Sequence, residues 1–212
     1  ICMLYDKDIR EPLFDFLEEA YGKLRIIEEK QVGKSRADIV MVLPGLLTGI
    51  EIKSDADSYV RLSRQVKDYD RFFDRNMVVA GSSHAAHVRE HVPGWWGIIT
   101  VEQNDREIDF YVLRQPQENP MMNWKRKLSL LWRPELAHIQ ELTAMPRYKE
   151  KSKAFVIEKI LAKVPGEQLS VLVSEELFER DYTRIEEVIR AYKIQNRPEL
   201  KGRTGKRKRR RP

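Results

Sequence analysis

Residues 36–69 read RADIVMVLPGLLTGIEIKSDADSYVRLSRQVKDY, and this stretch decides the fold that we expect. Two runs of β-forming residues are separated by Pro-Gly and Thr-Gly turn signals, which predicts an antiparallel hairpin. Because residues two apart on a strand share a face, Glu51 and Lys53 should point the same way, with the neighbouring isoleucines directed into a core. A hairpin of this length can bring Asp38 opposite Glu51, although the register itself is not readable from the sequence.

Two carboxylates and an ammonium at one end of a sheet suit the metal-assisted hydrolysis of a phosphodiester. The oxygens of Asp38 and Glu51, with waters and a substrate phosphate, would make a site for Mg²⁺ or Mn²⁺. The metal would activate water and offset the charge that develops on phosphorus. Lys53 could orient or deprotonate the attacking water, or stabilise the pentavalent oxygens. Taken alone, an E-x-K on a strand is more often an ordinary pair on a solvated face.

The order of these residues resembles the PD-(D/E)XK nuclease superfamily. Its D-x12-E-x-K core corresponds to Asp38, Glu51 and Lys53, with Ala37 where proline gives the pattern its name. The segment QVKDY, residues 65–69, resembles the QxxxY element of the RecB-like or Holliday-junction-resolvase-like branch.

This resemblance covers roughly residues 5–113 and implies a restriction-endonuclease-like fold. It also implies catalytic roles for Gln65 and Tyr69 near the metal and the DNA, and the main-chain carbonyl of Ile52 as a third metal ligand. The alternative for the two helical residues is that Tyr69 is plain core and Gln65 lies on the surface.

A further carboxylate is expected at the metal, and the sequence offers two rivals. Residues 6–21 predict an amphipathic helix that ends at Gly22. In the superfamily the opening helix often brings a carboxylate to the metal, and Glu11 is the best match, although a first-turn acid is also favoured by the helix dipole. Glu29, on a strand predicted over 24–32, should share a face with Gln31 and is the other candidate.

The helix predicted over 57–75 should have an apolar side and a basic side. Asp55 and Asp57 precede it and are expected to cap it. The expected core residues are Val60, Leu62, Val66, Tyr69, Phe72 and Phe73. The basic side, which we predict to bind nucleic acid, includes Arg61, Arg64 and Lys67.

The remaining pattern predicts a buried strand at 77–80, parallel to its partner after the crossover helix, and a hairpin of strands at 95–101 and 108–113. The histidines at 84, 87 and 91 have a spacing that could suggest metal ligation, with His84 directly after the strand end, but no cysteine or local pair of acids completes a site, so we expect polar surface residues. The predicted order is therefore α-β-β-β-α-β-α-β-β. This order predicts an α/β fold, a mixed sheet flanked by helices, with a C-terminal helical appendage.

We expect four segments. The resemblance implies a nuclease-like domain at 1–114, and the sequence pattern predicts a polar, proline-punctuated linker at 115–123, a helical region at 124–195 and a basic, disordered tail at 196–212. The helical region could hold DNA, cover the nuclease or form a homodimer. A break is expected in it at Trp132-Arg133-Pro134.

The net charge of +6 comes from the tail. Residues 201–212 hold eight of the Lys and Arg residues and no acid, so residues 1–200 carry a formal charge of −2. The tail, with Lys206, Arg207, Lys208 and Arg209, should attract phosphate backbones without sequence preference. The alternative is a solubilising end.

We expect an intracellular, cytoplasmic protein with no membrane partner. No run approaches the length of a membrane span, no signal peptide is visible, and the single cysteine, Cys2, excludes an intramolecular disulfide.

Two classes of function are consistent with the sequence. The first is a Mg²⁺- or Mn²⁺-dependent DNA nuclease of repair, recombination, or phage and mobile-element defence, with RNA cleavage as a variant. The second is a nucleic-acid-binding or scaffold protein on the same fold without catalysis.

Overall fold

The computed structural model describes residues 4–104, 107–181 and 185–195, and its strands form one mixed sheet in sequence order. The first strand pairs antiparallel with the second, and the second with the third. The third and fourth strands are parallel, as are the fourth and fifth, and the last two strands are antiparallel. The strands are β1 (Arg25–Val32), β2 (Ser35–Leu43), β3 (Leu46–Lys53), β4 (Arg75–Gly81), β5 (Gly97–Asn104) and β6 (Glu107–Arg114).

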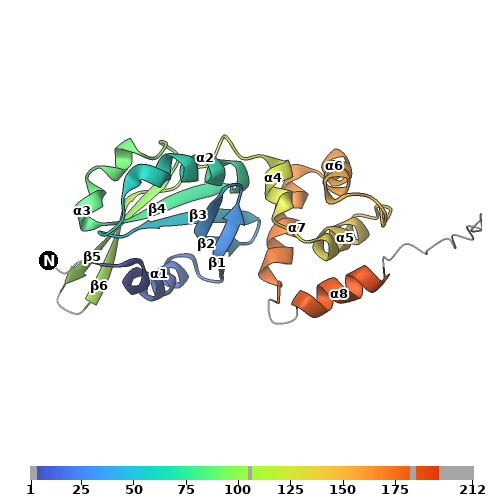
Figure 1. The fold of residues 1–212 in the computed structure, drawn as a ribbon, viewed down its shortest axis with the longest axis horizontal. Coiled ribbons are helices and arrows are strands. Elements are labelled where there is room, and N and C mark those ends of the chain that lie inside the picture. The colour runs from blue at the N-terminus through green and yellow to red at the C-terminus, as the bar shows by residue number, and fades with distance from the viewer. Residues whose placement is uncertain (1–3, 105–106, 182–184, 196–212) are drawn as a thin grey trace, which may run out of the picture.

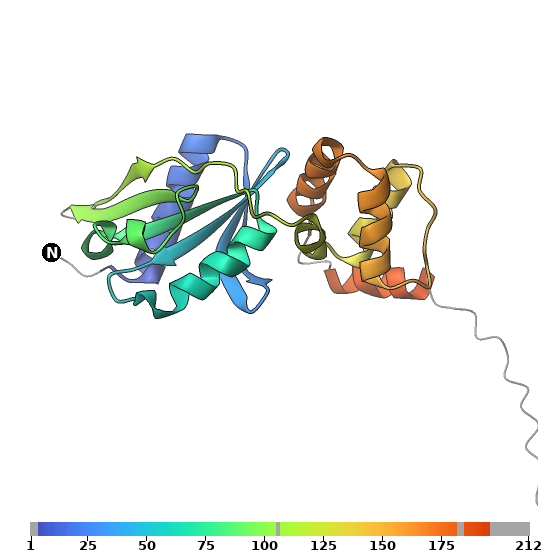
Figure 2. The same ribbon diagram turned by 90° about the horizontal axis from the view of Figure 1, so that it is seen from above.

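Helices lie on both faces of this sheet, and further helices lie beyond its β1 edge (Figures 1 and 2). On the sheet are α1 (Asp6–Tyr21), α2 (Leu62–Phe72) and α3 (Ser82–Ala85), with single 3-10 turns at η1 (Tyr59–Arg61) and η2 (Val88–Glu90). The α/β class and the element order expected from the sequence are confirmed. Beyond β1 lie α4 (Trp124–Ser129), α5 (Arg133–Leu142), α6 (Lys153–Lys163), α7 (Gly166–Phe178) and α8 (Ile185–Gln195).

The central strands carry apolar side chains to both faces. On β2, Ile39 and Met41 enter a core with α1, whereas Val40 and Val42 enter a second core with α2. A strand covered on both sides has no solvated face, and this explains the nearly unbroken apolar run at 37–43. Isoleucines 50 and 52 pack in the α1 core as expected.

The second core continues from the sheet into the C-terminal helices without interruption. The hydroxyl Oγ of Ser174 on α7 accepts a hydrogen bond from the Gly45 N–H in the β2–β3 turn at 2.8 Å. The buried ammonium of Lys127 on α4 binds both carboxylate oxygens of Asp74 at 2.7 and 2.8 Å. The segment 115–123 contains no helix or strand, but the Asn119 amide donates to the carbonyls of Asp70 and Phe73.

The helix expected over 57–75 is shorter than predicted. The α-helix begins at Leu62 after the 3-10 turn, and Val60 is 85% exposed, so its placement in the core was wrong. The two expected caps bind elsewhere: Asp57 accepts from the N–H and hydroxyl of Ser54, and Asp55 from the N–H of Leu4. Because Asp57 binds back to Ser54, it holds the chain after β3 in a turn before the helix starts.

The break expected at residues 132–134 is present, because α4 ends at Ser129 and α5 begins at Arg133 with proline in its first turn. Leu142, which was expected in the core, is 54% exposed at the end of α5. None of the helices in the described part of the chain combines the length and apolar composition that a bilayer crossing requires.

Candidate functional site

The register of the β2–β3 hairpin brings the two predicted carboxylates together. Ile39 pairs with Ile50, so Asp38 and Glu51 occupy the next positions on the two strands. The carboxylate of Asp38 turns toward β3 and accepts a hydrogen bond at Oδ2 from the Ile52 N–H at 2.8 Å. The hairpin therefore adopts the register that places Asp38 opposite Glu51, which the sequence alone allowed but did not specify.

Three side chains from β3 and α2 form a closed ring of hydrogen bonds. The Lys53 ammonium donates to Glu51 Oε1 at 2.7 Å and to Gln65 Oε1 at 3.2 Å. The Gln65 amide in turn donates to Glu51 Oε1. Glu51 is 1% exposed and Lys53 3% exposed, so this ion pair is held away from bulk water. An ammonium has three N–H donors, and these two bonds leave one for a group in the adjoining cavity.

Tyr69 connects the two strands that carry the carboxylates. Its hydroxyl donates to Glu51 Oε2 at 2.6 Å and accepts from the Asp38 N–H at 3.1 Å. The ring lies against β3 at Gly49, where an added Cβ would fall 2.7 Å from Tyr69 Cδ1. Glycine at this position therefore lets the fully buried tyrosine lie flat on the strand. Tyr69 is a core residue and a hydrogen-bonding partner of both carboxylate positions.

Burial and neighbouring negative charge perturb the pKa values of Asp38 and Tyr69. Burial, followed by the charge of Glu51, raises the pKa of Asp38 to about 7, although the Ile52 N–H and the charge of Arg10 act in the opposite direction. Burial and the same two carboxylates raise the pKa of Tyr69 well above its usual value. Two carboxylates that disfavour each other's charge favour a bound cation.

A polar cavity of about 520 Å³ opens over the cluster. Asp38, Glu51, Ile52, Lys53 and Gln65 all line it. Of the three basic residues predicted on the following helix, Arg61 and Arg64 line the cavity, whereas Lys67 is exposed and does not. The cavity is also lined by Lys34 and Arg36 beside the β1–β2 turn, which were not predicted as site residues from the sequence.

Helix α1 brings a cation to the cluster instead of the expected carboxylate. Glu11 is exposed and is not among the cavity residues. The preceding Arg10 does line the cavity, and its guanidinium donates to the Asp38 carbonyl at 3.4 Å, with Nη2 3.9 Å from Asp38 Oδ1. The sequence signal that could have pointed to Arg10 is Asp6, four residues earlier on the helix. Its carboxylate binds Arg10 Nε at 2.7 Å.

Glu29 reaches the cavity but binds cations there. Its two oxygens contact Arg10 Nη2 at 2.7 Å and Arg36 Nε at 2.5 Å. Its backbone has φ +53°, a conformation that side-chain-bearing residues rarely adopt. This distorts β1 opposite Asp38, so Glu28 and Glu29 both bind Arg10 although alternation places them on opposite faces. The expected alternation of side chains between the two faces of β1 is therefore wrong at Glu29.

Asp38 and Glu51, with Ile52 at their side, are the residues that could hold a divalent ion. Among the described residues, no group of three or more His, Cys, Asp or Glu side chains converges on one point. The donor chemistry nevertheless fits a hard cation, because a half-buried and a buried carboxylate line one polar cavity, where the charge of Glu51 disfavours ionised Asp38. The third carboxylate expected from Glu11 or Glu29 is not brought to them.

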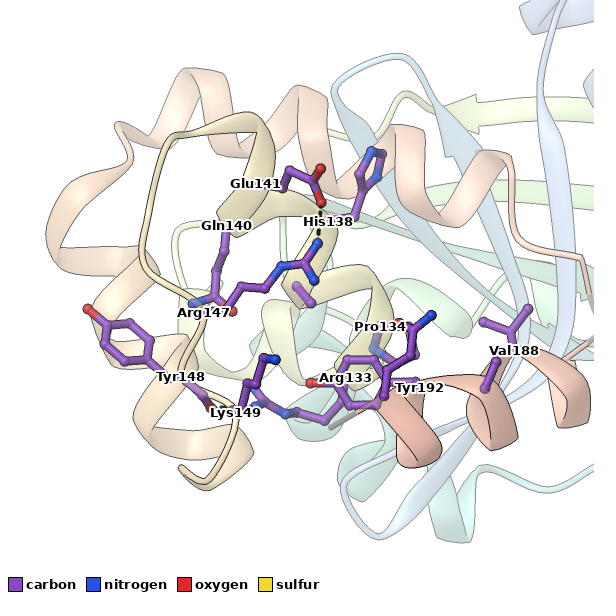
Figure 3. A pocket seen from close by; sticks show the side chains of 13 residues that line it. Arg133, Pro134, His138, Gln140, Glu141, Arg147, Tyr148, Lys149, Val188 and Tyr192 are labelled. Atoms are coloured by element: carbon purple, nitrogen blue, oxygen red, sulfur yellow. Dashed lines mark hydrogen bonds and ion pairs between the residues drawn. The ribbon is translucent and has the colours of Figure 1, made fainter. Parts of the chain in front are cut away.

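A second cavity, of about 300 Å³, lies in the helical part and is shown in Figure 3. Arg133 on α5 lines it and donates through Nη2 to the Tyr148 carbonyl at 3.0 Å. Arg147, at the same cavity, binds Glu141 at 2.7 Å. None of the residues predicted for the functional site lines this cavity.

Two further groups of residues were singled out from the sequence, the histidines at 84–91 and the basic tail. His84 and His91 pack against the Tyr59 ring at centroid distances of 4.9 and 4.1 Å, and of these two His91 is exposed whereas His84 is half-buried. The four predicted tail residues, Lys206 to Arg209, lie outside the described residues.

Comparison with known proteins gives relatives in two groups. Protein cII of Enterobacteria phage P4 is 25% identical over 138 residues, which cover 63% of this chain and 52% of that protein. The alignment thus spans about half the length of the relative. A solved structure, SfsA of Pyrococcus furiosus in complex with Ca²⁺, matches 52% of this chain and 62% of its own at 16% identity and a TM-score of 0.32. A TM-score of this size does not support an argument from the likeness.

The match to a family model is more extensive than either pairwise comparison. The model for bacteriophage P4 protein cII matches residues 3–197, which include the whole sheet, the cluster around Glu51 and the C-terminal helices. This chain therefore belongs to the bacteriophage P4 protein cII family.

Proposed function

We propose that this protein is a Mg²⁺- or Mn²⁺-dependent deoxyribonuclease that hydrolyses phosphodiester bonds in DNA repair, recombination, or phage and mobile-element defence. The observation that carries the proposal is the half-buried Asp38 beside the buried Glu51 and Lys53 on the wall of a polar cavity. The resemblance of its spacing to the PD-(D/E)XK pattern supports the same chemistry.

The chain's own residues would divide the work as follows. Asp38 and Glu51 would hold the ion, which would supply positive charge that activates water and offsets charge on the phosphate. Lys53 is oriented by Glu51 and Gln65, so its remaining N–H can hold the attacking water or a phosphate oxygen. Water would attack phosphorus and one P–O ester bond would break, giving a phosphate monoester and a hydroxyl. Tyr69 and Gln65 are positioning residues.

The substrate backbone would lie along the cations that line the cavity. Arg61 comes from η1 and Arg64 from the start of α2, and Lys34 and Arg36 come from the β1–β2 turn and the start of β2. The side chain of Asp68 on α2 fixes this turn, accepting from the Lys34 N–H at 3.2 Å and the Ser35 hydroxyl at 2.7 Å. Cations at fixed positions around the carboxylates would contact phosphates on both sides of the scissile bond.

The direct test is cleavage of supercoiled plasmid, linear duplex and single-stranded DNA, with Mg²⁺, Mn²⁺ or EDTA. We expect cleavage with metal by the parent protein and none by Asp38→Asn. The asparagine keeps an acceptor for the Ile52 N–H while removing a charged metal ligand. Equal cleavage by parent and variant would contradict the assignment.

The second candidate is a nucleic-acid-binding or scaffold protein without catalysis. One observation favours it: the third carboxylate is not found at the cluster among the described residues, while an ammonium already binds Glu51. A parent protein that binds DNA but never cuts DNA or RNA with either metal would decide for this candidate.

Metal should stabilise the folded protein, because a cation relieves the repulsion between Asp38 and Glu51. At a metal concentration about 100 times the dissociation constant, the gain is about 2.7 kcal/mol, or roughly 5–10 °C in Tm for a chain of this size. Thermal melts of parent and Asp38→Asn with Mn²⁺ and with EDTA measure it. An unchanged parent Tm, or an equal rise in the variant, would count against the ion site.

Deleting residues 201–212 should weaken DNA binding and flatten its dependence on salt, because eight cations are lost. Cleavage at saturating DNA should be unchanged, since the predicted catalytic residues all lie in the sheet domain. Fluorescence anisotropy over a salt series measures both quantities, with a Gly-Ser tail of equal length as control. If affinity and salt slope stay the same, the tail is not a nucleic-acid arm.

A further inference from the structure

A third cavity, of about 400 Å³, lies where the edge strand β1 meets the C-terminal helices. Lys30, Gln31 and Gly33 line it from β1 and its turn, and Arg126, Trp132 and Lys153 from the helical part. Its lining residues include three cations and no acid. This is unusual on a chain whose first 200 residues carry a slight net negative charge.

The cations at this cavity are not neutralised by carboxylates. Among the residues that the structure describes, no acid lies within ion-pair distance of Lys30, Arg126 or Lys153. Lys153 donates to the Ser129 carbonyl at 2.7 Å, and the Lys30 ammonium lies 5.8 Å from the Trp132 ring centroid.

Glu135, whose charge acts on both Lys30 and Lys153, already has a partner. Glu135 binds Arg180 through both oxygens at 2.6 Å, and Arg180 also lies 3.7 Å over the Trp132 ring. Burial, followed by the charge of Arg180 and aided by Lys153, lowers the pKa of Lys30 to about 8. Several positive charges close together at a half-buried site favour the binding of an anion, which reduces their repulsion.

This cavity adjoins the candidate catalytic cavity. Gln31 lines both of them, and the β1–β2 turn contributes Gly33 to the third cavity and Lys34 to the catalytic cavity. Arg36 and the carboxylate cluster line the catalytic cavity, whereas Lys30 and residues of the helical part line the third. A polyanion that leaves the catalytic cavity over the turn would meet a further group of cations.

We propose that the cavity between β1 and the helices α4 and α6 is a second phosphate-binding site, which holds the backbone of the same DNA that enters the catalytic cavity. The inference rests on the proposed function for the identity of the ligand. It assigns the C-terminal helices a part in substrate binding: Arg126 and Lys153 would contact a phosphate together with Lys30, away from the scissile bond.

The test compares the full chain with the variant Lys30→Gln/Arg126→Gln in EDTA, where no cleavage occurs. The probes are a fluorescent 30-mer duplex and a 6-mer duplex, which has far fewer phosphates and is expected to occupy one cavity at a time. We expect the Kd of the 30-mer to rise about ten-fold and its salt slope to fall by roughly two, because two phosphate contacts are lost. The affinity for the 6-mer should change less than two-fold.

The matched control is Lys125→Gln/Lys159→Gln, which removes two exposed charges, one from α4 and one from α6. Lys125 binds Glu158 at 2.8 Å and does not line the cavity. Lysine acetylation of the unmodified protein, read by mass spectrometry, gives a measurement that needs no variant. The 30-mer should protect Lys30 several-fold, while the 6-mer does not and Lys125 stays reactive.

Two results would overturn the inference: an acetylation rate at Lys30 that the 30-mer leaves unchanged, or a 30-mer affinity equal in the Lys30→Gln/Arg126→Gln variant and the control. Its failure is distinguishable from that of the nuclease proposal. Protection of Lys30 in a protein that never cleaves DNA would support the second site and reject the catalysis. Cleavage without protection would do the reverse.

Discussion

Replacing Lys53 with methionine should slow DNA cleavage by about 10²–10³-fold, equivalent to about 2.7–4 kcal/mol of transition-state stabilisation, the usual size for one positioned donor. The ammonium is 3% exposed and is held by Glu51 and Gln65 at the wall of the cavity, so no other cation can take its position without rearrangement. Methionine keeps the bulk of the stem and removes the charge. Single-turnover cleavage at saturating DNA measures the effect.

The matched control is Lys67→Met, which removes the same charge from an exposed position that does not line the cavity. Both variants should bind DNA nearly as well as the parent, because each loses at most one phosphate contact among several. The metal-induced rise in Tm should persist in Lys53→Met, since Asp38 and Glu51 remain. If Lys53→Met cuts DNA at the parent rate, the assigned chemistry is wrong.

Asp74→Ala should destabilise the protein by about 3–5 kcal/mol, because it leaves a buried ammonium without its partner. Lys127 is 0% exposed, and its ammonium binds both oxygens of Asp74. Burial lowers the pKa of Lys127, and Asp74 counteracts this shift. The same carboxylate accepts from the Leu47 N–H at 2.8 Å, so a second buried donor also loses its acceptor. Urea denaturation gives the free energy of unfolding.

A double-mutant cycle isolates the ion pair. Lys127→Met should cost less than Asp74→Ala, because Asp74 is 14% exposed and keeps the Leu47 N–H. The double variant Asp74→Ala/Lys127→Met should recover part of the loss, since no unpaired charge stays buried. Strictly additive losses in the double variant would mean that the pair does not couple the sheet to α4.

Much of the fold could be predicted from the sequence, because local periodicity and turn residues determine which segments become helices and strands. The hairpin of β2 and β3, the helix that carries Gln65 and Tyr69, and the parallel return of β4 follow from patterns a few residues long. Element ends were less predictable. The first turn before α2 is 3-10, and it follows a segment that Asp57 holds in a turn by binding back to Ser54.

The candidate site was predictable only where its residues are close in the chain. Glu51 and Lys53 share a strand face, and Gln65 and Tyr69 a helix face, so a motif could name them together. The roles of Glu11 and Glu29 were not predictable in this way. The rotation of α1 about its buried stripe turns Arg10 toward Asp38 and leaves Glu11 exposed, and the left-handed backbone of Glu29 interrupts the alternation of β1.

The sequence by itself determined the order of elements, the pairing of two acids with a lysine and the basic tail, because each depends on neighbours along the chain. Only the tertiary structure decided the register that places Asp38 beside Glu51, the cation that α1 contributes and the cavity where Lys30, Arg126 and Lys153 meet. These three cations come from distant segments, and their proximity depends on how the helices pack against β1. Packing of that kind sums many weak contacts between remote residues, and no local pattern encodes it.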